Sequence, residues 1–150
     1  YNNPSLLDIE DKYTITEDMK ARLDDFAAGY ATEEECAQNI KKVYDKTGYV
    51  MDTHTSVASY VCECYQKNSG DNKKCVIAST ASPYKFPRSI CKALDINVEN
   101  LNDFEVVKEL NKETNVEIPK NLRDLDKKEI LHNEVWDKDE MKKALLSYLK

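Results

Sequence analysis

Apolar residues recur along most of the chain at intervals of three and four positions. This spacing predicts amphipathic helices, because residues three and four apart lie on one helical face. Three of the apolar stripes follow a capping box: Thr32 with Glu35, Asn102 with Glu105, and Asp137 with Glu140. We therefore predict helices over residues 17–28, 32–48, 53–68, 87–93, 102–112 and 137–149.

Two short apolar runs interrupt the helical pattern, Tyr49–Met51 and Cys75–Ala78. Continuous apolar residues are typical of strands that are covered on both faces of a sheet. Together with the helix between them they predict a short parallel β-α-β unit, so the expected fold class is α/β with a helix-rich chain. A two-stranded sheet is rarely stable alone. We therefore expect the remaining strands to lie outside these 150 residues.

Composition narrows the expected partners. The 150 residues carry a formal net charge of −6, which argues against nucleic acid and anionic membranes. No apolar run approaches the roughly 20 residues that span a bilayer. The five cysteines lack the spacing of a disulfide framework, which favours reduced thiols in the cytoplasm. The length suffices for one compact domain over residues 1–150.

Polar side chains gather where the two predicted strands end. Parallel strands of such a unit open on the same sheet edge, where α/β folds bind ligands. His54 follows the first strand and can orient an anionic substrate or transfer a proton, with a structural histidine as the alternative. Ser79 and Thr80 follow the second strand and can hydrogen-bond a ring nitrogen or a carboxylate, or can satisfy a local turn.

Two cations lie close to the same predicted edge. Lys85 and Arg88 can meet a phosphate or carboxylate, and a solvated face is the alternative. The sequence gives little support to a metal site or to a phosphate-binding loop. Cys62 and Cys64 fall on opposite sides of a helix, which is unsuited to a metal chelate. Three glycines in total leave no phosphate-binding glycine loop.

Two extended motifs resemble one known family. Residues 47–58 read TGYVMDTHTSVA, which resembles the pattern T-G-Y-x-x-D-P-H-T-A-V-A. Residues 79–87 read STASPYKFP, which resembles S-T-A-[HS]-P-x-K-F-P. Both patterns, in this order and separation, are those of threonine synthase, a pyridoxal-phosphate enzyme of the tryptophan-synthase-β type. The chain departs from them at Thr53, where the pattern has proline, and at Ser82, where many members have histidine.

The resemblance implies a reaction in threonine biosynthesis, in which O-phospho-L-homoserine and water give L-threonine and phosphate. The cofactor pyridoxal phosphate acts as electron sink on an enzyme lysine. In this family that lysine and the glycine-rich phosphate loop lie upstream, and neither motif occurs here. The chain thus resembles a C-terminal segment, which needs the remainder of the enzyme's own chain and is expected to be inactive alone.

The same resemblance assigns roles to individual residues. A hydroxyl at this point of the fold meets the pyridine nitrogen of the cofactor, and Thr80 is the first candidate with Ser79 second. Asp52, His54 and Thr55 match the other motif and are expected to line or brace the site. The motif lysine, Lys85, is expected to hold the substrate phosphate or to anchor its loop.

A second hypothesis treats the chain as a non-catalytic helical module that binds a partner protein. Its well-capped helices and the missing lysine motif are compatible with this role. The parent open reading frame discriminates between the two hypotheses, because an upstream lysine motif and glycine-rich loop would support the enzyme.

Overall fold

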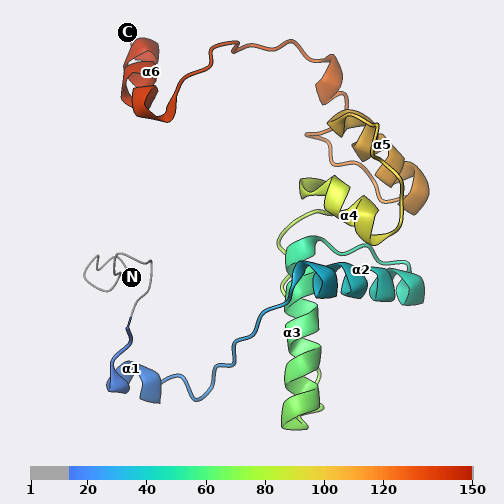
Figure 1. Ribbon diagram of the computed structural model, residues 1–150, viewed down its shortest axis with the longest axis vertical. Coiled ribbons are helices and arrows are strands. Elements are labelled where there is room, and N and C mark those ends of the chain that lie inside the picture. The colour runs from blue at the N-terminus through green and yellow to red at the C-terminus, as the bar shows by residue number, and fades with distance from the viewer. Residues whose placement is uncertain (1–13, 150) are drawn as a thin grey trace. The chain divides into compact units, whose positions relative to one another are not determined.

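The computed structural model describes residues 14–149, and its α-helices are labelled in Figure 1. The described residues fall into two units, one up to Ile118 and one from Pro119 onward. The first unit contains α1 (Glu17–Ala21), α2 (Glu33–Thr47), α3 (Thr53–Ser69), the short 3-10 helix η2 (Pro83–Lys85), α4 (Pro87–Ala93) and α5 (Asp103–Thr114). The second contains η3 (Leu125–Lys127), η4 (Lys138–Glu140) and α6 (Met141–Tyr148).

Two of the three predicted capping boxes are confirmed. At the start of α2 the Glu35 N–H donates to the Thr32 hydroxyl at 3.2 Å, and the Thr32 N–H donates to the Glu35 carboxylate at 2.8 Å. Asn102 and Glu105 form the same reciprocal pair at the start of α5. Gly48 ends α2 with a φ of 73°, a left-handed conformation that glycine adopts without a steric penalty.

The predicted parallel β-α-β unit is wrong, because residues 14–149 contain no strand and are helical wherever they are regular. Val50 and Met51 are buried as predicted, but they form an extended link from α2 into α3. Cys75–Ala78 is exposed throughout, and Val76 is 95% exposed. A strand requires a neighbour to complete its backbone hydrogen bonds, and neither apolar run has one within the described part of the chain.

Two helix boundaries also differ from those predicted. The first predicted helix, 17–28, is reduced to the five residues of α1. Gly29 then passes so close to α3 that an added Cβ would lie 2.7 Å from Cγ1 of Val61. Near the C-terminus Asp137 caps no helix with its side chain, and η4 precedes α6 there. The predicted capping box of Asp137 and Glu140 is therefore wrong.

The core of the first unit lies where α4 packs against α2 and α5. Its most deeply buried apolar side chains are Ile40, Ile90, Val106 and Leu110. Burying one such side chain contributes about 1.5–3 kcal/mol, so these four residues are the main apolar support of the packing. A second contact joins α2 to α3, and it positions the start of α3.

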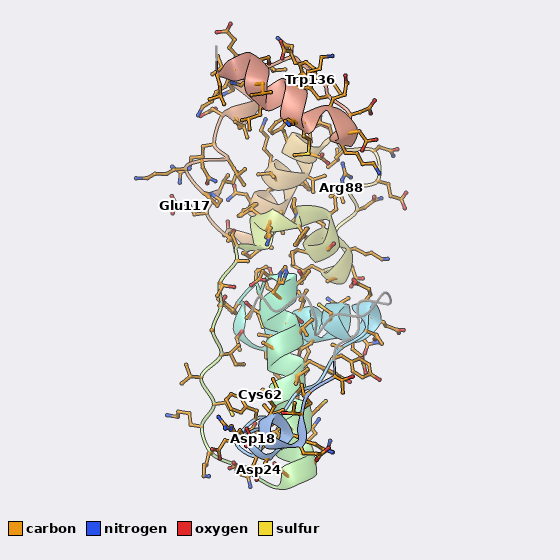
Figure 2. The ribbon with its side chains drawn as sticks, turned by 90° about the vertical axis from the view of Figure 1, so that its left-hand side faces the viewer. Asp18, Asp24, Cys62, Arg88, Glu117 and Trp136 are labelled. Carbon is orange, nitrogen blue, oxygen red and sulfur yellow. The ribbon has the colours of Figure 1, made fainter. Side chains whose placement is uncertain are left out.

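Arg88 is tied into the fold. Its guanidinium donates to the backbone oxygen of Leu101 at 2.6 Å, to that of Val98 at 3.3 Å and to the Asp103 carboxylate at 3.0 Å. These bonds join α4 to the link before α5 and to the first residue of α5; Arg88 is labelled in Figure 2. Arg88 therefore has a structural role. The alternative of a solvated face did not include these bonds.

The second unit is organised around Glu134. Its carboxylate accepts from the Trp136 indole N–H at 3.2 Å and from the Tyr148 hydroxyl at 3.0 Å. The Lys143 ammonium group lies 5.4 Å from the centre of the Trp136 ring, within the range of a cation-π contact. Over residues 14–149, no helix has the length and apolar character that crossing a membrane requires.

Candidate functional site

The start of α3 is built on one buried carboxylate. Asp52 is 2% exposed, and its Oδ1 accepts from the backbone N–H groups of His54 at 2.9 Å and Thr55 at 3.3 Å. The Thr55 hydroxyl donates to Oδ2. Burial acts to raise the pKa of Asp52, but the hydrogen bonds from Thr55 and His54 outweigh it and hold the pKa below its ordinary value. Asp52 is therefore a charged helix cap.

A hydrogen-bonded relay joins the two sequence motifs. The hydroxyl oxygens of Thr55 and Ser79 lie 2.9 Å apart. Thr55 has one hydroxyl proton, and it is directed at the Asp52 carboxylate, which cannot donate when charged. Ser79 must then donate to Thr55, so the relay runs from Ser79 through Thr55 to Asp52. This contact brings together three of the residues predicted to lie at the site.

His54 lies beside the relay with its side chain 58% exposed. Its Nδ1 is 3.4 Å from Oδ1 of Asp52, and its ring stacks on Phe86 with centroids 5.8 Å apart and planes 28° apart. The Lys85 ammonium group lies 5.5 Å from the centre of the same Phe86 ring. Phe86 thus places a histidine and a lysine from different motifs against one aromatic ring.

Thr80 stands outside the relay. It is exposed, and within residues 14–149 its hydroxyl has no hydrogen-bond partner. The structure therefore joins Ser79 to Asp52 and Thr55 but leaves Thr80 open to a ligand. A pocket of about 340 Å³ is lined in part by His54, Phe86 and Val57, and neither Ser79 nor Thr80 is among its lining residues.

Two buried polar residues that sequence reasoning missed support the site. The Asn39 amide of α2 donates to the Ser56 backbone oxygen at 3.0 Å, and the Ser56 hydroxyl donates to the Cys36 backbone oxygen at 2.8 Å. Both side chains are buried, so the bonds hold α2 against the first turn of α3. The sequence feature that could have revealed this role is the polar residue at position 39, on the apolar stripe between Cys36 and Ile40.

The donor set fits only part of a pyridoxal-phosphate site. Thr80 offers an open hydroxyl of the kind that meets a pyridine nitrogen. A phosphate-binding loop requires glycines, but the three glycines are used elsewhere. Gly48 and Gly70 end helices, and Gly29 lies against Val61. None of them belongs to a phosphate-holding loop. Among residues 14–149 no three histidine, cysteine or acidic side chains gather as metal ligands.

Comparison with known proteins agrees with the two motifs. The profile of the family described as "Threonine synthase, C-terminal" matches residues 55–144. "Threonine synthase-like 1" of Homo sapiens is 38% identical over 78 residues, which is 51% of this chain and 10% of that protein. "Threonine synthase" of Schizosaccharomyces pombe is 30% identical over 77 residues, 51% of this chain and 15% of that protein.

The mouse "Threonine synthase-like 1" is likewise 38% identical over 78 residues. The chain thus spans about a tenth of the length of the curated relatives that it matches first. The family profile covers more than half of the chain and includes the whole second motif. The resemblance carried by the motifs is confirmed, and the chain belongs to the threonine synthase C-terminal family.

Proposed function

We propose that residues 1–150 are the C-terminal segment of a threonine synthase, which converts O-phospho-L-homoserine and water to L-threonine and phosphate. The family match carries this proposal, and the printed name of the Schizosaccharomyces pombe relative supports it. The match favours the enzyme over a non-catalytic interaction module. The spacing of the cysteines supports a cytoplasmic location.

Pyridoxal phosphate is the cofactor in this proposal, and it supplies the electron sink of the reaction. Thr80 is the first candidate for the pyridine nitrogen, and Ser79 is the second. Their hydrogen bonds support this order, because Ser79 donates its proton to Thr55 whereas the Thr80 hydroxyl is open. The lysine and the phosphate loop come from the remainder of the enzyme's own chain.

The substrate side of the proposed site uses the other motif residues. Asp52 and Thr55 hold Ser79 and the first turn of α3 in place. His54 and Lys85 are both exposed beside Phe86, and their cationic forms attract an anion. We assign them to the phosphate or carboxylate of O-phospho-L-homoserine.

Thr80→Val in the full-length protein tests the assignment. Valine has nearly the shape of threonine but lacks the hydroxyl, so we expect an approximately tenfold loss of cofactor affinity, the value of one hydrogen bond. Spectral titration with pyridoxal phosphate measures the affinity, and phosphate release from O-phospho-L-homoserine measures the rate. Thr14→Val is the matched control, because Thr14 is exposed and outside both motifs.

Two results would count against the proposal at different levels. Unchanged affinity and rate in Thr80→Val would remove this residue from the cofactor site while leaving the reaction intact. Absence of phosphate release by the full-length wild-type protein would overturn the reaction itself. The isolated 150-residue chain is expected to show no activity in the same assay.

A further inference from the structure

Two of the five cysteines lie together on the side of α3, apart from the relay. Cys62 belongs to α3 and is labelled in Figure 2, and Cys75 belongs to the segment that follows this helix. The Cys75 thiol donates to the backbone oxygen of Lys73 at 3.7 Å. The Gln66 amide, one helical turn beyond Cys62, donates to the Cys75 sulfur at 3.3 Å. The Cys75 thiol therefore lies over the α3 face that carries Cys62.

Local hydrogen bonds bring Cys75 to this position. Gly70 ends α3 with a φ of 72°, and the chain then turns back toward α4 (Figure 2). The Gln66 amide also donates to the backbone oxygen of Lys73 at 2.8 Å. The returning segment is thus attached to α3 at two points, both of which use the same glutamine side chain.

The two thiols differ in accessibility. Cys75 is exposed and can be reached by a small disulfide, whereas Cys62 is half-buried. The neighbouring Cys75 thiol, and then burial, raises the pKa of the Cys62 thiol. Cys62 therefore keeps its proton while Cys75 is the sulfur that meets a reagent first. This is the arrangement of an attacking thiol beside a resolving thiol.

We propose that Cys62 and Cys75 form a reversible disulfide when the protein meets glutathione disulfide. The Cys75 thiolate attacks one sulfur of glutathione disulfide, the S–S bond breaks, and one glutathione thiolate leaves. Cys62 then loses its proton to solvent and attacks the Cys75 sulfur, which releases the second glutathione. The two protein thiols are oxidised, and one glutathione disulfide is reduced to two glutathione molecules that take up the protons.

The bond would fasten the segment after α3 to the helix covalently. The ring it closes encloses Lys73 and Lys74, and the segment continues directly to Ser79. Oxidation would thereby restrict the movement of the polypeptide segment that leads from Cys75 to Ser79 of the relay.

Peptide mapping of the full-length protein tests the proposal. The protein is equilibrated with glutathione disulfide, alkylated, and digested with trypsin without reduction. Cleavage at lysines gives one peptide over 47–67, with Cys62 and Cys64, and another over 75–85, with Cys75. We expect the two peptides to be linked in the wild type and separated again by reduced glutathione.

Two serine variants identify the partner of Cys75. Cys64→Ser is the matched control, because it removes a neighbouring thiol of the same peptide, and it should keep the link. Cys62→Ser should lose the link and leave Cys75 joined to glutathione. A wild type that carries only glutathione adducts would overturn the proposal. A link that survives in Cys62→Ser but disappears in Cys64→Ser would do so as well.

Discussion

Replacement of Asp52 by alanine is expected to lower the free energy of unfolding by about 2–4 kcal/mol. The change removes the helix cap of α3 and leaves two backbone N–H groups and the Thr55 hydroxyl without their acceptor. Thr55 is buried, so the loss exceeds that of an exposed cap. Urea denaturation followed by far-ultraviolet circular dichroism measures the effect.

Asp24→Ala is the matched control for this experiment. Asp24 is exposed and lies between α1 and α2, where Figure 2 labels it. We expect its replacement to change the free energy of unfolding by less than about 0.5 kcal/mol. Equal effects of the two replacements would show that the Asp52 cap contributes nothing specific.

The contribution of Asp52 should also depend on pH. Its pKa is lowered in the folded protein, so the carboxylate stabilises the fold above the unfolded value near about 4. This contribution is lost as the pH falls through the folded pKa. The stability difference between wild type and Asp52→Asn should therefore shrink in acid, and a difference that grows in acid would contradict the charged cap.

Replacement of Ile90 by alanine is expected to cost about 2–5 kcal/mol of stability. Ile90 is 0% exposed, and it lies in α4, which packs against both α2 and α5. Removing its larger side chain creates a cavity that both neighbouring helices would have to close. The same denaturation measurement applies.

Ile130→Ala provides the same chemical change on the surface. Ile130 is 71% exposed in the second unit, so its replacement should change stability by less than about 0.5 kcal/mol. If Ile90→Ala were as mild as this control, α4 could not be the centre of the packing.

Local interactions made much of the helical structure predictable. Thr32 with Glu35 and Asn102 with Glu105 are three residues apart, and the hydrogen bonds they form depend only on that spacing. Asp52 stands directly before the helix predicted over 53–68, and it caps α3 there. Such signals lie within one helical turn, so they do not depend on the rest of the fold.

The predicted strands depended on distant partners. The apolar run at Cys75–Ala78 has strand composition, but composition supplies no neighbour to hydrogen-bond with. The site shows the same limit. The motifs identified Asp52, Thr55 and Ser79 separately, whereas the relay arises from one contact between residues 24 positions apart. The helix-to-helix bonds of Asn39 were missed for the same reason.

The position of Trp136 determines which part of this chain can be followed by indole fluorescence. It is the only tryptophan in the sequence, and it lies in the second unit, hydrogen-bonded to Glu134 and covered by Lys143. Selective excitation of indole emission in these 150 residues therefore reports unfolding around α6. The helices that carry Asp52 and Ile90 contain no indole and remain silent in that channel. Comparing fluorescence with circular dichroism would show whether the two units unfold together or in succession.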